Sequence, residues 1–202
     1  MNVKLKTWLP AVIFLAAAAV LIVLYFVMPE QRELRRRPEE FSGIFTTLGT
    51  IGLYVGAAGF SWLWFRRKHK SPSMLVRKAG KLFYASHKPL GWVTLILVAA
   101  HGTFLLLTRQ WDNQIYSGLA GFVLLLAIVG YGFTIHKVRN KWMRTVHRTL
   151  GLLWVPVLWL HAGGSAIIAV MSALAVGCAV YVLEKRAGQI EQSEPNLRKK
   201  HL

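Results

Sequence analysis

The chain has 202 residues and a formal net charge of +17, and 54% of its residues are hydrophobic. This apolar composition excludes an ordinary soluble domain of the same size, and basic loops beside a membrane favour anionic lipid over nucleic acid as a partner. The single cysteine, Cys178, lies in an apolar run, which excludes a disulfide framework, a CxxC redox pair and a cysteine-rich metal site.

The apolar segments predict an all-α membrane bundle of six transmembrane helices. The predicted spans cover roughly residues 8–28, 41–65, 84–108, 115–135, 145–162 and 165–183. The first span follows two lysines, as a signal peptide does, but its long apolar part and its lack of a small-x-small cleavage site favour a retained helix. We divide the chain into the first helix with its outer loop (1–40), the main transmembrane domain (41–184) and a polar cytoplasmic tail (185–202).

Basic residues alternate between the loops, and the positive-inside rule then predicts the orientation. The N-terminus, the second and fourth loops and the tail hold 20 of the 25 Lys and Arg residues, whereas the other three loops hold five. We therefore expect an N-in and C-in protein of the plasma membrane, with both termini in the cytoplasm.

Two copies of one histidine pattern lie in the third and fifth predicted spans. Residues 87–101 read HKPLGWVTLILVAAH, and residues 147–161 read HRTLGLLWVPVLWLH. Each copy opens with His, a basic residue, any residue, Leu and Gly, and it closes on a second His fourteen residues after the first. Chance rarely produces the same opening and the same interval twice, so we predict a shared function for His87, His101, His147 and His161.

The fourteen-residue interval predicts which histidines meet. Fourteen residues of an ideal helix return to within roughly 40° of the starting direction and rise roughly 21 Å. Because metal–imidazole bonds are about 2 Å long, one helix cannot supply both ligands of one metal. The third and fifth spans run in the same direction, so His87 is level with His147 and His101 is level with His161. The sequence thus predicts two bis-His sites, the first near the cytoplasmic face and the second near the outer face.

Haem is the metal group that suits such sites. A bare ion with two imidazoles lacks ligands, whereas haem supplies its own four equatorial nitrogens. Gly91 and Gly151, one turn after the first histidine of each copy, are predicted to leave room for a flat macrocycle. Lys88 and Arg148 directly follow those histidines and are predicted to neutralise haem propionates, which is worth about 1 kcal/mol each.

The remaining polar candidates carry less information. His136 is an alternative ligand for the cytoplasmic-side site, although an interfacial position is favoured, and neither His69 nor His201 needs a special role. The three arginines at 35–37 are expected in the outer loop, as a solvated patch rather than as a docking site.

Glycine and proline mark three further positions. Gly52 and Gly56 form a GxxxG, which either brings two helices close together or is merely tolerated in the membrane. Gly163 and Gly164 predict a tight turn between the last two spans. Pro156 leaves the carbonyl of Leu152 without its helical donor and predicts a kink in the fifth span.

Paired histidines on the third and fifth spans resemble the ferric reductase-like transmembrane domain. That family includes membrane ferric reductases, NADPH oxidases and the haem-binding membrane subunit of the bacterial methionine sulfoxide reductase system. The resemblance covers roughly residues 41–183, and the four histidines match the family's haem ligands one for one. It implies two b-type haems stacked across the membrane, as in a cytochrome b, which pass electrons outward. A full set of four histidines is more similar to the two-haem reductases than to the sulfoxide reductase subunit.

The expected function is therefore transmembrane electron transfer, with this chain as the haem component of an oxidoreductase. Residues 184–202 hold no glycine-rich dinucleotide fingerprint, so a cytoplasmic flavoprotein or quinol is the expected donor. Ferric iron, oxygen or a partner reductase is the expected outer acceptor. The alternatives are a haem-free transporter or proton channel that uses stacked histidines, and a passive membrane anchor. The third to sixth predicted spans contain no Asp or Glu, which argues against the channel.

Overall fold

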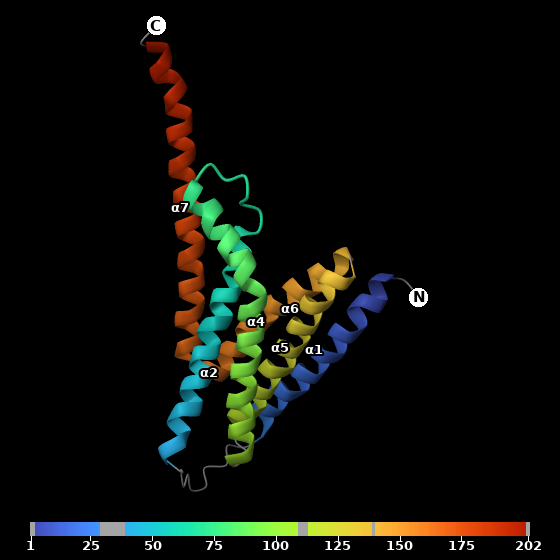
Figure 1. The fold of residues 1–202 in the computed structure, drawn as a ribbon. Helices are drawn as coiled ribbons and strands as arrows, with labels where there is room; N and C mark the ends of the chain where they lie inside the picture. The colour runs from blue at the N-terminus through green and yellow to red at the C-terminus, as the bar shows by residue number, and fades with distance from the viewer. Residues whose placement is uncertain (1–2, 29–38, 109–112, 139, 201–202) are drawn as a thin grey trace.

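The computed structural model describes residues 3–28, 39–108, 113–138 and 140–200, and the side chains at 39–42, 136 and 191–200 are outside the description. Every regular element in this part of the chain is a helix (Figure 1). The helices are α1 (Val3–Val27), α2 (Glu39–Phe60), α3 (Trp62–Phe65), α4 (Met74–Thr108), α5 (Asn113–Lys137), α6 (Lys141–Ala162) and α7 (Gly164–Lys200). The expected all-α class is confirmed.

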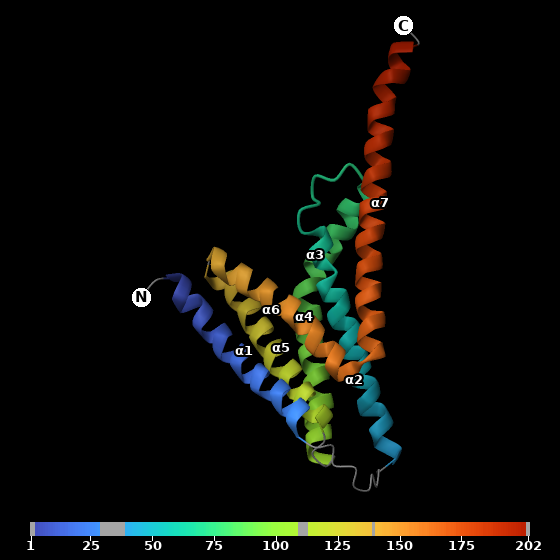
Figure 2. The ribbon, with the colours of Figure 1, turned by 180° about the vertical axis from the view of Figure 1, so that it is seen from behind.

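The helices form two groups that meet at the middle of the bundle (Figures 1 and 2). In one group α2 packs along α4, and in the other α5 packs along both α1 and α6. Helices α1, α5 and α6 lean away from α4 and α7 toward one end of the molecule. The start of α1, residues 66–73 and the junction of α5 with α6 all lie toward this end, which we call the basic end because of its lysines and arginines.

Five helical segments are long and apolar enough to cross a membrane. They are Val3–Val27, Gly43–Phe65, Met74–Thr108, Asn113–Ile135 and Gly164–Ile190. The fifth predicted span corresponds to α6, which forms as a continuous helix of 22 residues through Pro156 but is not among the five. Its first two turns contain Lys141, Arg144 and Arg148, and these charges lower its hydropathy.

The helices that do qualify expose large apolar side chains to their surroundings. Phe26 of α1 is 67% exposed, Leu107 of α4 is 80% exposed and Met171 of α7 is 59% exposed. Exposure of this kind is costly in water and favourable against acyl chains, so it indicates a bilayer around the bundle. The interior uses small residues instead: Ala11 and Ala18 of α1 are buried in one cluster with residues of α5 and α6, and small residues permit close helix approach in lipid.

Several element boundaries differ from the sequence prediction. The second predicted span is divided at Ser61, which separates α2 from α3. Helix α4 begins at Met74, within the basic loop, well before the predicted start of its span. Gly163 alone separates α6 from α7, and its φ of 54° is the left-handed backbone that glycine adopts without strain, so the predicted tight turn is confirmed.

The GxxxG of α2 brings helices close together. A Cβ added at Gly52 would lie 3.2 Å from Cγ2 of Val98, and one added at Gly56 would lie 3.3 Å from Cγ2 of Thr94. Both contacts are with α4, so these glycines let α2 approach the helix that carries the first histidine pattern. The close-packing interpretation therefore holds, and the merely tolerated one does not.

Candidate functional site

The first histidines of the two patterns lie together toward the basic end. The imidazole centroids of His87 in α4 and His147 in α6 are 6.1 Å apart, with ring planes at 87°. Each ring is anchored by a neighbouring helix: Nδ1 of His87 lies 2.9 Å from the carbonyl oxygen of Gly59 in α2, and Nδ1 of His147 lies 2.9 Å from that of Ile128 in α5. Both rings are half-buried.

The second histidines, fourteen residues further along each helix, form a matching pair. The centroids of His101 and His161 are 6.3 Å apart, with ring planes at 75°. Nδ1 of His101 lies 2.7 Å from the carbonyl oxygen of Phe45 in α2. Nδ1 of His161 lies 3.2 Å from the carbonyl oxygen of Gln114 and 3.3 Å from the hydroxyl of Ser117, both in α5. The structure therefore brings together the two pairs that spacing and topology predicted.

The separation within each pair can be compared with that of two imidazoles on one metal atom. A five-membered ring with bonds of about 1.33 Å has its atoms roughly 1.1 Å from its centre. With metal–nitrogen bonds of about 2.0–2.1 Å, two opposed imidazoles have centroids roughly 6.2–6.4 Å apart. The observed 6.1 Å and 6.3 Å fit that spacing.

The hydrogen bonds at Nδ1 determine which ring nitrogen is available for other chemistry. A backbone carbonyl only accepts, so each Nδ1 must carry the proton and donate it. In a neutral imidazole the lone pair is then on Nε2 in all four histidines. Metal-ligating histidines use this arrangement, in which the second nitrogen donates to a carbonyl and thereby fixes the tautomer and the ring orientation.

The carbonyls that accept these bonds repeat the spacing of the histidines. In α2 the acceptors are Phe45 and Gly59, and in α5 they are Gln114 and Ile128; each pair of acceptors is fourteen residues apart. Helix α2 runs antiparallel to α4, and α5 runs antiparallel to α6. Each therefore reaches both histidines of its neighbour through carbonyls that are fourteen residues apart. Helices α2 and α5 thus serve α4 and α6 in the same way, and this supporting role was absent from the sequence prediction.

Glycines make room for the anchored rings. A Cβ at Gly49 or at Gly118 would lie 2.7 Å from Cε1 of His101 or His161, respectively, and one at Gly132 would lie 3.2 Å from Cε1 of His147. Each of these glycines lies four residues, or one helical turn, after the carbonyl that the ring binds. A side chain at this position would crowd the ring and push it from its place. The signal is present in the sequence as the fourteen-residue interval from Gly118 to Gly132.

The glycines predicted to face a macrocycle border open space. An ideal Cβ at Gly91 or at Gly151 would meet no heavy atom within 4 Å among the described residues outside its own turn. Lys88 and Arg148 are exposed, one residue after the inner histidines. In addition, α4 and α6 are not among the closely packed helix pairs of the described part of the chain, so the two histidine-bearing helices approach one another through their side chains.

Two buried side chains lie at the midpoint between the sites. Thr94 is seven residues from each histidine of α4, and Trp154 is seven residues from each histidine of α6. Thr94 is 1% exposed and Trp154 is 8% exposed, and both approach Gly56 of α2. The indole Nε1 of Trp154 donates to the carbonyl of Gly121 at 2.8 Å, which fixes its ring between the two pairs.

Among the other histidine and arginine candidates, His69 is the one whose side chain the structure describes, and it is not brought to either pair. The side chain of His136, the arginines at 35–37 and His201 lie outside the described residues. His69 is exposed in the loop after α3. Within the described residues no group of three or more His, Cys, Asp or Glu side chains could hold a metal ion, so each pair offers two imidazoles without a third protein ligand.

Comparisons of the chain with models of protein families, with curated proteins and with solved structures found no match. The site is therefore interpreted from its own residues.

Proposed function

We propose that this chain is the membrane component of an electron-transfer system, with two bis-His b-type haem sites. His87 and His147 would hold the iron on the cytoplasmic side, and His101 and His161 would hold it on the outer side. The observation that carries the proposal is the pair of centroid separations, 6.1 Å and 6.3 Å, in rings whose Nδ1 atoms all bind carbonyl or hydroxyl oxygens. The resemblance to the ferric reductase-like transmembrane domain supports the same function.

Haem bound at such a site carries one electron at a time by alternating between ferric and ferrous iron. The four carbonyl contacts fix the imidazoles before any ligand arrives, and they raise the basicity of Nε2. Gly91 and Gly151 would accept the flat face of the macrocycle, and Lys88 and Arg148 would pair with propionates. Because each site would supply two imidazoles to the iron, the sites suit electron relay rather than substrate binding.

The proposed topology has six spans, with both termini in the cytoplasm of the plasma membrane. The basic end then faces the cytoplasm, in agreement with the positive-inside rule. The donor in this scheme is a cytoplasmic flavoprotein or quinol, and the acceptor is ferric iron, oxygen or a partner reductase outside. Haem ligation by α6 favours its insertion despite its charged first turns, since its histidines must reach the level of those in α4.

Reduced-minus-oxidised spectra and the haem-to-protein ratio of the purified chain test this proposal. We expect b-type bands and two haems per chain. His101→Ala and His161→Ala should each lower the ratio to about one haem per chain. The two variants should show the same spectrum, because each would retain the haem held by His87 and His147. His69→Ala is the matched control, because His69 lies in a loop outside both pairs, and it should retain two haems.

Colourless protein, or b-type bands that survive alanine at all four paired histidines, would overturn the proposal. A colourless chain that conducts protons in vesicles would support the channel alternative. A colourless chain without conductance, whose cellular role survives all four substitutions, would support the anchor alternative.

A further inference from the structure

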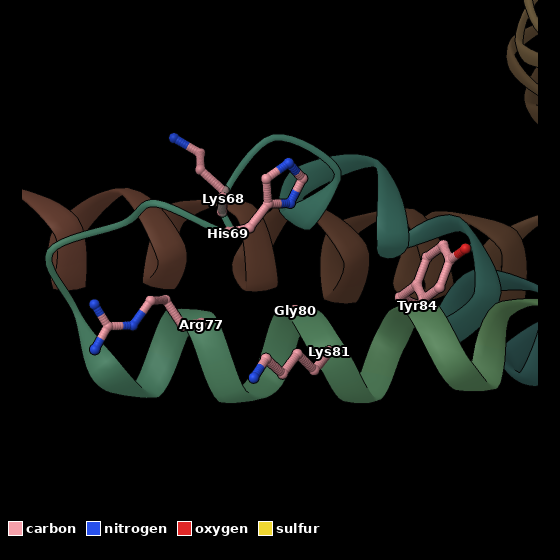
Figure 3. A pocket seen from close by; sticks show the side chains of 6 residues that line it. All are labelled: Lys68, His69, Arg77, Gly80, Lys81 and Tyr84. Carbon is pink, nitrogen blue, oxygen red and sulfur yellow. The ribbon is translucent and has the colours of Figure 1, made fainter.

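A small basic pocket lies at the basic end, between the loop after α3 and the first turns of α4 (Figure 3). Lys68 and His69 line it from the loop, and Arg77, Lys81 and Tyr84 line it from α4, with Gly80 between them. In Figure 3 the two loop residues lie across the pocket from the α4 side chains. The pocket is separate from both histidine pairs, and none of the proposed haem-binding residues lines it.

The loop over this pocket is held in place by specific contacts. Lys68 forms an ion pair with Glu184 of α7, and Arg77 donates from Nη1 to the carbonyl of Ser71 at 3.3 Å. Ser71 and Ser73 are 4% and 8% exposed, and the hydroxyl of Ser71 accepts from the N–H of Ser73 at 3.3 Å. These contacts hold the loop in place, so the hollow between the loop and α4 is preformed.

The charge of the pocket selects an anion. Lys68, Arg77 and Lys81 contribute three positive charges, none of the lining residues is acidic, and Glu184 offsets one charge through Lys68. About two positive charges remain, which is enough to neutralise the phosphodiester of an anionic phospholipid, whose phosphate carries one negative charge. Arg77 can offer a planar pair of donors to phosphate oxygens, as guanidinium groups do at phosphate sites.

The size of the pocket limits what it can enclose. Its volume is about 100 Å³, which holds several waters or one tetrahedral anion but is well below the roughly 300 Å³ or more of pockets that enclose a whole small molecule. The ligand is thus either a free phosphate or the phosphate of a larger molecule that extends outside. Tyr84, which lines the pocket and is 66% exposed, offers an aromatic surface beside it. Basic pockets at membrane surfaces commonly bind anionic head groups.

We propose that Arg77, Lys81 and Lys68 bind a phosphate group, with an anionic phospholipid as its source. Phosphatidylglycerol fits both the charge of the pocket and the aromatic surface beside it. Phosphatidylcholine carries the same phosphate, but its choline leaves no net charge for the pocket to neutralise.

Native mass spectrometry of the full-length protein, with phosphatidylglycerol or phosphatidylcholine added to the detergent, tests this site. The test variant is Arg77→Gln with Lys81→Gln. The control is Lys70→Gln with Lys78→Gln, which removes the same charge from exposed residues that do not line the pocket. We expect the control to retain phosphatidylglycerol like the wild type, and the test variant to bind it at least about tenfold more weakly, because it loses two cationic donors to the phosphate.

Competition with inorganic phosphate separates the two sources. Displacement of phosphatidylglycerol from the wild type supports a phosphate site that prefers lipid. Binding of inorganic phosphate that depends on Arg77 and Lys81, without lipid binding, supports a phosphate site with a soluble ligand. Equal losses in the two double variants, or no binding of either compound to the wild type, would overturn the proposal.

Discussion

The hydroxyl of Tyr131, in α5, donates a hydrogen bond of 2.6 Å to the backbone carbonyl of Thr7, in α1. The same hydroxyl accepts a bond of 3.1 Å from the N–H of Ala11. In a regular helix the N–H of Ala11 would bind the carbonyl of Thr7 directly. Pro10 lies in the same turn, and a side chain inserted beside a proline can replace a lost backbone bond. The hydroxyl of Tyr131 thus links two backbone groups of α1 to α5.

Tyr131→Phe should lower the stability of the bundle without affecting the histidine pairs. Loss of a buried hydroxyl that satisfies two backbone groups costs about 1–3 kcal/mol, so we expect a lower thermal midpoint of unfolding in detergent. Tyr181→Phe is the control, because Tyr181 is 67% exposed. Equal midpoints for the two variants would contradict a structural role for the Tyr131 hydroxyl.

Gly118→Ala should displace His161. The new Cβ would lie 2.7 Å from Cε1 of that ring, so the ring must shift away from its acceptor carbonyl. We expect the haem-to-protein ratio to fall from two toward one, although alanine favours a helix by about 1 kcal/mol over glycine. Gly130→Ala provides the comparison, because Gly130, in the same helix, borders open space. The prediction fails if both variants retain the same haem content.

Gly91→Leu and Gly151→Leu test the open space beside these two glycines. Both positions border open space, so the apo protein should tolerate leucine there and keep its thermal midpoint. If this space receives the flat face of a macrocycle, leucine should exclude the inner haem and leave the outer one, which a haem ratio near one would show. Gly130→Leu, also in an open position but exposed on α5, should retain both haems. Full haem content in all three variants would show that the open space beside Gly91 and Gly151 does not hold the cofactor.

The sequence predicted the histidine pairs because their geometry depends mainly on one number. A fourteen-residue interval fixes the face and the rise within a helix, and parallel direction then makes His87 level with His147. The acceptor carbonyls at Phe45 and Gln114 could not be predicted in the same way, because they depend on how α2 and α5 are rotated against their neighbours. Every residue has a backbone carbonyl, so the sequence does not indicate which one accepts the hydrogen bond. The glycines near the acceptors are the sequence feature that indicates the contact.

The basic pocket shows a second limit of sequence reasoning. Composition predicted a basic loop and a role for lipid, but it gave His69 no function and treated the charge as diffuse. The fold brings Lys68 across from Arg77, nine positions later, because α4 begins inside the loop and Glu184 holds the loop from α7. That convergence depends on a tertiary contact between residues 116 positions apart.

The last prediction concerns whether α6 crosses the membrane. α6 begins with charged turns at Lys141, and its apolar remainder ends at Ala162, two residues before Gly164. The only native cysteine, Cys178, is first replaced by serine, and a single cysteine is then introduced at Lys141 or at Gly164. If α6 spans the bilayer, a membrane-impermeant thiol reagent applied to intact cells should label the Gly164→Cys protein and not the Lys141→Cys protein. Disruption of the cells should make both sites reactive.

Lys70→Cys, in the loop beside the basic pocket, and Thr108→Cys, at the far end of α4, calibrate the two sides of the membrane. In the N-in and C-in arrangement Lys70→Cys reacts only after disruption, whereas Thr108→Cys reacts in intact cells. If Gly164→Cys behaves like Lys70→Cys, α6 lies along the cytoplasmic face, and six spans are excluded. That outcome would also remove His161 from the level of His101, so the proposed topology and the proposed outer haem site depend on the same measurement.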